Sequence, residues 1–189
     1  SAQRVIKEIE FILHKFPQVK IIDPIDDNFF VDEQRVKDIC QGIISKNIKI
    51  KWRANCRFDY FSTYDRDFVS LLEKAGCIEL DFGGESGSAR LQEFVCKDVT
   101  AEQMMQSVSN LRKWAPSIEP YVSWLSGLPN ETYEDLLKTF DLMDTLIQIN
   151  PRTQHYNIFM YTPFPSPMLE SLESGFQPPR SLEEWGNIE

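Results

Sequence analysis

Residues 79–91 have the sequence ELDFGGESGSARL, in which an apolar, strand-like run leads into two glycines, an acid and a second Ser-Gly pair. Gly83 and Gly84 lack a Cβ and can adopt positive φ, so a ligand can approach the main chain closely there. Glu85 and Ser86 add a hydrogen-bond acceptor and a donor that suit a sugar hydroxyl or an amino group. An ordinary strand-to-helix turn has the same composition, so the stretch alone leaves both interpretations open.

Helical and strand-like patterns alternate on both sides of this stretch. Apolar residues at helical spacing predict helices over residues 4–16, 32–44, 65–76, 88–95, 100–115 and 130–150. Short β-like runs between them predict strands over residues 19–23, 48–54, 77–82, 118–127 and 155–161. Thr100 and Asn130 are the expected N-caps of the last two helices. Strands separated by helices imply parallel, right-handed connections, so the expected fold class is α/β, either a barrel or an open doubly wound sheet.

The composition is typical of a globular protein. The 189 residues are 42% hydrophobic and 12% aromatic, which is enough for one packed core, so residues 1–189 are expected to form a single domain. The formal charge of -9 disfavours nucleic acid or an anionic membrane as a partner. No run approaches the roughly 18 apolar residues of a membrane span, and no signal peptide is evident, so a cytoplasmic location is expected.

The cysteines and histidines do not form a recognisable metal motif. Cys40, Cys56, Cys77 and Cys96 are widely spaced, with no CxxC pair and two histidines in the chain, so buried free thiols are expected. His155 begins a strand and is expected to be structural. The acids of residues 23–28 (DPIDDN) suit solvated turns better than a divalent cation, because their spacing differs from that of a calcium loop.

In both candidate architectures, ligands gather at the carboxyl ends of the parallel strands. Gly127 follows one strand and marks another close approach of the backbone. Arg57 follows a different strand and is either part of a structural ion pair or a substrate contact. The five expected strand ends are DPIDDN (23–28), RANCRFD (53–59), DFGGES (81–86), SGLPNE (126–131) and YTPFP (161–165).

Taken in order, these motifs resemble the core of the radical S-adenosylmethionine superfamily, and particularly its cobalamin-associated branch. The resemblance covers nearly the whole chain, although Asn130 and Ser166 stand where the family usually has glycine. It implies a partial (β/α) barrel in which strands 2 to 6 are present and the first strand and the cluster loop are missing. The matching segments are VIKEIEFI with VKIIDPIDDNFFVD, IKWRANCRFDYF, AGCIELDFGGESGSARLQEFVCKDVTAEQ, YVSWLSGLPNETYEDLLKT and FMYTPFPSPMLESL.

The resemblance also implies where S-adenosylmethionine lies. Asp26 and Asp27 would be near its methionine amino end, Glu85 and Ser86 near the amino group or the ribose, and Lys97 beside the carboxylate. The same resemblance implies that the main chain approaches the ligand at the two glycines of the GGES turn, and that the adenine is lined by Gly127, Leu128, Tyr161, Phe164 and Pro165. No catalytic residue is identified.

The implied enzyme needs a 4Fe-4S cluster, whose CxxxCxxC motif is absent from these residues. Either the chain is a piece that begins after the first strand, which the missing initial Met favours, or it is a degenerate member without the cluster. In the first case the cluster cysteines are expected upstream of Ser1, and no metal ligand is expected within residues 1–189.

The implied function is the S-adenosylmethionine-binding part of an enzyme that cleaves this cofactor to a 5′-deoxyadenosyl radical or, in the cobalamin branch, transfers a methyl group. By themselves these residues are expected to be inactive. The implied partners are a small-molecule substrate, an electron donor and, in that branch, an upstream cobalamin domain.

Two other functions remain open from the sequence. One is a barrel-type hydrolase that uses Glu85 and Glu131 as acid and base, although Glu131 lies where a helix N-terminus favours an acid. The other is a non-catalytic module that binds S-adenosylmethionine.

Overall fold

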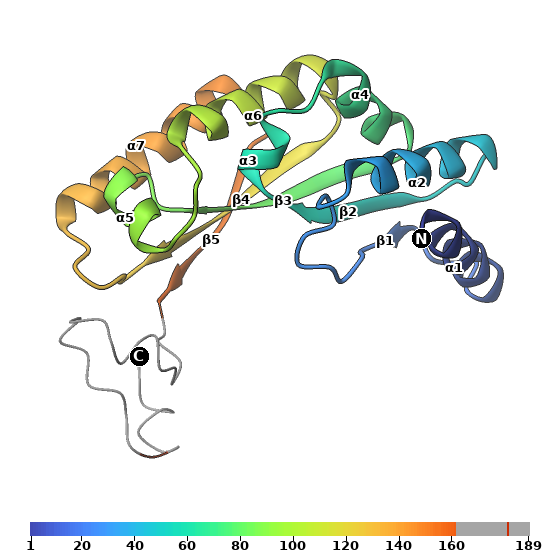
Figure 1. The fold of residues 1–189 in the computed structure, drawn as a ribbon, viewed down its shortest axis with the longest axis horizontal. Coiled ribbons are helices and arrows are strands. Elements are labelled where there is room, and N and C mark those ends of the chain that lie inside the picture. Colours follow the sequence, from blue (N-terminus) through green and yellow to red (C-terminus); the bar gives the residue numbers. More distant parts are fainter. Residues whose placement is uncertain (162–180, 182–189) are drawn as a thin grey trace.

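Five parallel strands form one sheet in the order β1-β2-β3-β4-β5. The computed structural model describes residues 1–161 and 181. Because the order in space follows the order in sequence, every connection returns on the same side of the sheet, as in a barrel and unlike a doubly wound sheet. The sheet is not closed, so the expectation of a partial (β/α) barrel is confirmed (Figure 1). The strands are Ile21–Ile22, Lys51–Cys56, Cys77–Glu85, Glu119–Ser126 and Gln154–Met160, for β1 to β5 respectively.

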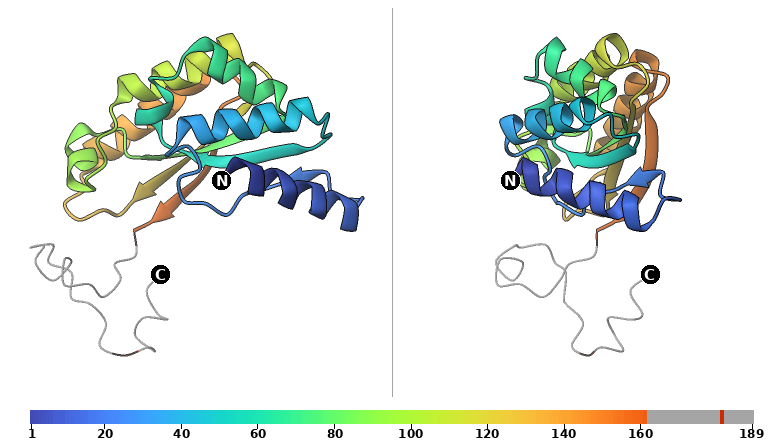
Figure 2. Two further views of the ribbon diagram at one scale, coloured as in Figure 1. Left: turned by 45° about the vertical axis from the view of Figure 1, so that its right-hand side comes forward. Right: turned by 90° about the vertical axis from the view of Figure 1, so that its right-hand side faces the viewer.

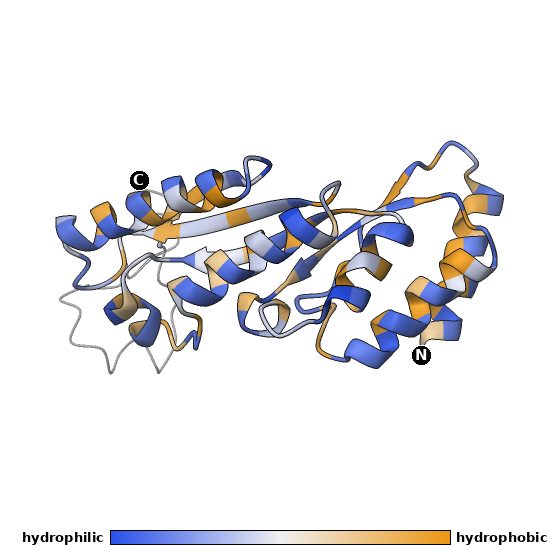
Figure 3. Cartoon of the chain, turned by 90° about the horizontal axis from the view of Figure 1, so that it is seen from above, coloured by the Kyte–Doolittle hydropathy of each residue, from blue (hydrophilic) through white to orange (hydrophobic). Residues whose placement is uncertain are grey.

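Helices α2 to α7 lie on one side of the sheet, and α1 packs against α2 beside the edge strand β1 (Figure 2). All the long helices were predicted, but the short α3 was not. The helices carry both hydrophobic and hydrophilic residues (Figure 3). Within the described residues, no helix is long and apolar enough to cross a membrane. Helices α1 to α7 are Ala2–Lys15, Glu33–Ser45, Phe58–Phe61, Arg66–Lys74, Ala89–Phe94, Ala101–Trp114 and Tyr133–Ile149.

Helix α1 begins directly after Ser1, which occupies its N-cap position. The carbonyl oxygen of Ser1 accepts from the N–H groups of Arg4 and Val5 at 3.1 and 3.3 Å, while its side chain makes no capping hydrogen bond. The first turn of α1 is thus closed by main-chain bonds. The cluster cysteines expected upstream of Ser1 lie outside the described residues, so that expectation stays a prediction.

One of the two expected helix caps is confirmed and the other is wrong. Thr100 caps α6, and its side chain and that of Gln103 form a reciprocal capping box. Helix α7 is capped by Thr132 and not by Asn130. The Thr132 hydroxyl accepts a hydrogen bond from the backbone N–H of Asp135, whereas Asn130 adopts a φ of 62° in the preceding turn.

The two faces of the central strands differ sharply in polarity. The face toward the helices, here called the packed face, is apolar, and its Phe82 stacks on Phe58 of α3 with ring centroids 4.3 Å apart. Burying one such aromatic side chain contributes roughly 1.5–3 kcal/mol. The opposite face, here called the open face, comprises Arg53, Asn55, Glu79, Asp81, Gly83, Tyr121 and Ser123. Parallel strands buried on both sides are usually apolar throughout, so the polar open face differs from a sheet face that is packed in a core.

The cysteines follow the sequence expectation with one exception. Cys40, Cys56 and Cys77 are free and buried, and burial raises the pKa of the Cys40 thiol to about 12. Cys96 is also free but is exposed, so the expectation of burial is wrong there. Cys96 lies in the turn after α5 and has a φ of 53°.

His155 is structural, as expected. Its Nδ1 accepts a hydrogen bond from the Trp124 indole N–H at 3.0 Å, which places the ring proton on Nε2, 3.0 Å from the carbonyl oxygen of Met143. This neutral ring ties β5 to both β4 and α7. Burial lowers the pKa of His155 below its ordinary value.

The half-buried His155 predicts a pH-dependent stability. Because its pKa is lower in the folded than in the unfolded chain, protonation favours unfolding, and its stabilising contribution is lost as the pH falls below about 6.5. The free energy of unfolding, measured by urea denaturation, should therefore fall more steeply in the wild type than in His155→Gln as the pH is lowered from 8 to 5. Parallel curves for the two proteins would contradict this role.

Candidate functional site

The carboxyl end of β3 is irregular. The pairing of β3 with β4 shifts register between Gly83 and Glu85, which is a β-bulge, and Glu85 adopts a φ of 55°. Neither Gly83 nor Gly84 adopts the positive φ that glycine permits, because the positive φ falls on the acid that follows them. Bulges of this kind redirect a side chain, and positive φ in a residue other than glycine is uncommon and often functional.

The redirected Glu85 forms an ion pair with Lys97 over Gly83. The Lys97 Nζ donates to Glu85 Oε1, and the Glu85 side chain is 13% exposed. A Cβ added at Gly83 would lie 2.6 Å from each of these two atoms. Gly83 therefore leaves room for an ion pair on the open face. Gly84 faces the packed side instead, where an added Cβ would meet Val122 and Trp124.

Two neighbouring side chains, one from α5 and one from α7, form hydrogen bonds with the turn at the bulge. The Gln92 amide of α5 donates to the carbonyl oxygens of Gly84 and Ser86. The Ser86 hydroxyl is 1% exposed and lies 3.3 Å from the Thr139 hydroxyl of α7, which also accepts from the N–H of Gly87 at 2.9 Å. We therefore assign Ser86 to support of the turn, because its hydroxyl is buried against α7.

A buried carboxylate joins the same turn to the start of α7. Asp135 accepts hydrogen bonds from Ser88 and Thr132, and it also forms an ion pair with Arg90. The hydrogen bonds from Ser88 and Thr132 hold the pKa of Asp135 well below its usual range. The turn after β3 is thus fixed to the helix that follows β4.

The end of β4 presents its main chain. Gly127 is exposed with a φ of 78°, and its N–H donates to the Glu131 carboxylate at 2.5 Å. Glu131 also accepts from the Ser126 hydroxyl at 3.2 Å. Leu128 is buried, and the N–H of Tyr161 donates to the carbonyl oxygen of Ser126 at 2.7 Å. The predicted adenine residues Gly127, Leu128 and Tyr161 are thereby brought together, while Phe164 and Pro165 lie outside the described residues.

The ends of β1 and β2 carry the remaining predicted residues. Asp26 Oδ1 accepts from the N–H of Asn28 at 3.1 Å, and the residue lines a cavity of about 330 Å³ beside α1. Asp27 is exposed. Arg57 forms a bidentate ion pair with Asp59, at 3.0 Å from Nε to Oδ1 and 2.9 Å from Nη2 to Oδ2. This geometry favours the structural interpretation of Arg57.

The sequence did not predict that charged side chains form a row on the open face. Arg53 joins Asp23, at 2.9 Å, to Glu79, at 3.2 Å. Beside this network lies Asp81, to which residues 1–161 and 181 provide no hydrogen bond or ion pair. Burial, reinforced by the charge of Glu79, raises the pKa of Asp81 to about 6. The strict polar and apolar alternation of residues 79–82 was the available signal for this row.

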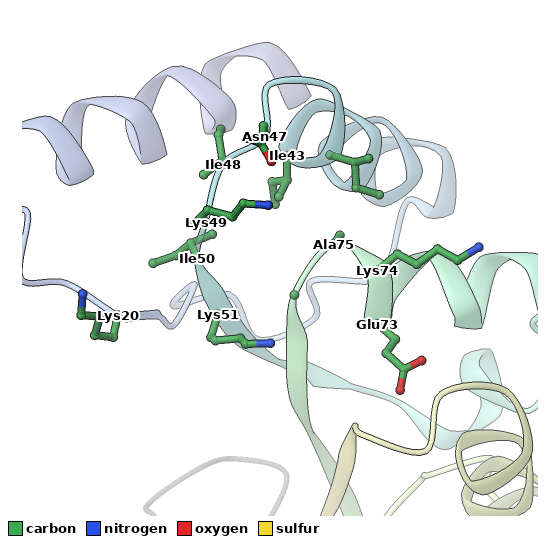
Figure 4. Close-up of a pocket in the computed structure, with 12 residues that line it drawn as sticks. Lys20, Ile43, Asn47, Ile48, Lys49, Ile50, Lys51, Glu73, Lys74 and Ala75 are labelled. Carbon is green, nitrogen blue, oxygen red and sulfur yellow. The ribbon is translucent and has the colours of Figure 1, made fainter.

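The described residues provide no metal-ligand group for this site, and the cavity lined by Lys20 and Glu73 lies elsewhere. Among the described residues, no group of three His, Cys, Asp or Glu side chains is placed to hold a metal ion, so they do not fit an iron–sulfur cluster. A cavity of about 490 Å³ lies at the opposite, amino-terminal ends of β2 and β3. Its lining combines isoleucines with charged side chains (Figure 4), namely Ile43, Ile44, Ile48 and Ile50 with Lys20, Lys49, Lys51, Lys74 and Glu73.

Comparison with known sequences gives relatives of which this chain matches a part. No family model matches. The chain is 32% identical over 139 residues to an uncharacterized methyltransferase of Pyrococcus horikoshii, covering 74% of this chain and 29% of that protein. It is 26% identical over 163 residues to the anaerobic magnesium-protoporphyrin IX monomethyl ester cyclase of Rubrivivax gelatinosus, covering 86% and 28% respectively. The chain thus spans less than a third of these relatives.

Comparison with solved structures identifies the fold. The radical S-adenosylmethionine methyltransferase TsrM of Kitasatospora setae, solved with cobalamin and a 4Fe-4S cluster bound, superimposes with a TM-score of 0.65. The match has 21% sequence identity and covers 77% of this chain and 29% of that one. At this identity the likeness shows the fold.

Proposed function

Because the chain carries the core fold of the radical S-adenosylmethionine superfamily, we propose that residues 1–189 are one domain that binds S-adenosylmethionine in an enzyme of this class. The observation that carries the proposal is the Glu85–Lys97 pair over Gly83. The methionine end of S-adenosylmethionine has an amino and a carboxylate group, so it matches an acid and a base held side by side. In this proposal the amino group binds Glu85 and the carboxylate binds Lys97.

The other contacts follow from the geometry of the strand ends. The exposed main chain at Gly127 and the neighbouring Leu128 and Tyr161 suit a flat purine, because a residue without a Cβ lies beside an apolar and an aromatic side chain. The Asp26 and Asp27 carboxylates lie after β1, and we assign them to the methionine end of the site. When bound, S-adenosylmethionine supplies either a transferable methyl group or, once reduced, a carbon radical.

The iron–sulfur cluster and any cobalamin need residues other than those described. The buried cysteines Cys40, Cys56 and Cys77 are not gathered into a ligand set. We therefore propose that the whole protein holds these groups with other segments, the cluster cysteines lying upstream of Ser1, and that residues 1–189 position S-adenosylmethionine and the substrate. Methyl transfer, as in the methyltransferase relative, is the reaction we favour.

A carboxylate hydrolase is disfavoured by the same geometry. Glu85 is paired with Lys97, and Glu131 accepts hydrogen bonds from Gly127 and Ser126. Both carboxylates are thus held by protein donors, which disfavours their use as a catalytic acid and base.

A pair of ligands tests the role of Lys97. The protein should bind S-adenosylmethionine in calorimetry, and Lys97→Met should weaken this binding about ten-fold, the size of one charge-assisted hydrogen bond. 5′-Methylthioadenosine lacks the amino acid part, so its weaker binding should be equal in the two proteins. If Lys97→Met weakened the binding of both ligands by the same factor, Lys97 would act by maintaining the fold and not by contacting the amino acid part. Binding of neither ligand to the wild type would overturn the proposal.

A further inference from the structure

We propose that Asp81, with Asn55 and Tyr121 beside it, forms a binding site for a substrate that is an organic cation carried on an aromatic or other planar group. This inference rests on the proposed function, because it places the substrate next to S-adenosylmethionine. Asp81 pairs in register with Asn55 of β2 and with Tyr121 of β4, so the three residues form a row across the sheet.

The row lies on the open face and beside the proposed cofactor site. Leu80 and Phe82, on either side of Asp81, are buried among the helices, so strand alternation directs the Asp81 side chain to the opposite face. Gly83, under the Glu85–Lys97 pair, is two residues further along the same strand. Two strand residues span about 7 Å, so the row lies next to the proposed cofactor site.

The chemistry of the row selects a cation with hydrogen-bond donors. Residues 1–161 and 181 offer the Asp81 carboxylate no donor, although it is partly buried. The Asn55 amide nitrogen donates to the carbonyl oxygen of Asp26, and no described residue donates to its amide oxygen. A partly buried, unpaired carboxylate favours a positively charged partner.

Two tyrosines add accessible aromatic rings to the proposed binding site. The rings of Tyr121 and Tyr156 have centroids 6.0 Å apart, and both are accessible. Aromatic faces attract cations and stack on planar groups, so they reinforce the preference set by Asp81. A protonated amine on an aromatic ring satisfies the carboxylate and the tyrosines together.

Three probes of similar shape test the site: tyramine, neutral 4-ethylphenol and anionic 3-(4-hydroxyphenyl)propionate. Binding to the full protein is measured by ligand-observed NMR, with and without S-adenosylmethionine. Tyramine should bind about ten-fold more tightly than 4-ethylphenol, and Asp81→Asn should remove that advantage while leaving 4-ethylphenol unchanged. The matched control is Glu119→Gln, which removes one negative charge from a carboxylate already 2.6 Å from Arg152.

The pH dependence gives a second readout. Asp81 is faced by Arg53 on β2, Glu79 on its own strand, Asp23 after β1 and Tyr121 on β4. Arg53 stays protonated and is paired with Glu79 and Asp23, so Asp81 is the group that titrates near pH 6. Tyramine affinity should therefore fall below about pH 6 in the wild type and be flat in Asp81→Asn.

The results that would contradict these expectations each have a different meaning. Equal binding of tyramine and 4-ethylphenol, or an equal loss in Glu119→Gln, would overturn the cation site. An Asp81→Asn variant that lost S-adenosylmethionine affinity by the same factor would assign Asp81 to the cofactor instead. Failure of the wild type to bind S-adenosylmethionine would bear on the proposed function alone, because tyramine binding is also measured without it.

Discussion

Gly87→Ala should lower the free energy of unfolding by about 3 kcal/mol, at the upper end of the cost of overpacking. A Cβ at this position would lie 2.6 Å from Thr139 Cα and closer still to the carbonyl oxygen of Lys138. Both atoms belong to the backbone of α7, which cannot rotate aside as a side chain can. The substitution would therefore push the turn after β3 away from α7 and break its bonds to Thr139.

The matched control for this substitution is Gly42→Ala. There the added Cβ would lie 2.9 Å from Ile6 Cγ1, which belongs to a flexible side chain. Replacing glycine by alanine inside a helix also gains about 1 kcal/mol, which offsets part of the contact. Urea denaturation of both variants should show a small change for Gly42→Ala and a large one for Gly87→Ala. Similar losses in the two variants would mean that the turn can move with little cost.

Gly83→Ala should weaken S-adenosylmethionine binding about a hundred-fold, because it disturbs two charge-assisted hydrogen bonds at once. Its Cβ would lie 2.6 Å from both Glu85 Oε1 and Lys97 Nζ. These atoms are the ends of long side chains, so the ion pair moves aside while the backbone stays in place. Stability in urea should consequently change little.

Ser123→Ala is the control for the binding measurement. Ser123 pairs in register with Gly83 on the open face, and its hydroxyl donates to the carbonyl oxygen of Phe82 at 3.4 Å. Its replacement removes a polar group beside the site without moving the ion pair, so calorimetry should give nearly wild-type affinity. If Gly83→Ala bound S-adenosylmethionine as well as Ser123→Ala does, Glu85 and Lys97 would not contact the ligand.

The sequence predicted the sheet well because each element carries its own local signal. The apolar stripe of α6 and its cap Thr100 are both contained in residues 100–115, so the helix could be located without the rest of the fold. The same reasoning misplaced the cap of α7 because Asn130 and Thr132 are both good capping residues. Only the position of Asp135, which returns the hydrogen bond, distinguishes them.

The site was less predictable because its geometry depends on contacts between distant segments. The pairing of Glu85 with Lys97 joins residues separated by a helix, and the positive φ at Glu85 depends on the bulge against β4. The burial of Ser86 by Thr139 requires α7 to pack on the turn. None of these contacts leaves a periodic pattern in the sequence. Asp81 did leave one, since its strand alternates and it begins the DFGGES strand end, but the pattern alone gives it no role.

The alternation of the central strands also bears on how such a protein can be altered. On β2, on β4 and on β3 from Glu79 onward, the open-face residues have odd numbers, such as Asn55, Asp81 and Tyr121, and the buried residues have even numbers. A gene library that randomises only the odd-numbered codons of β2, of β4 and of residues 79–85 would therefore change what the sheet recognises while the buried positions of these strands, Cys77 included, kept their residues. Parity in the numbering thus separates the positions that can diversify from those that keep the chain folded.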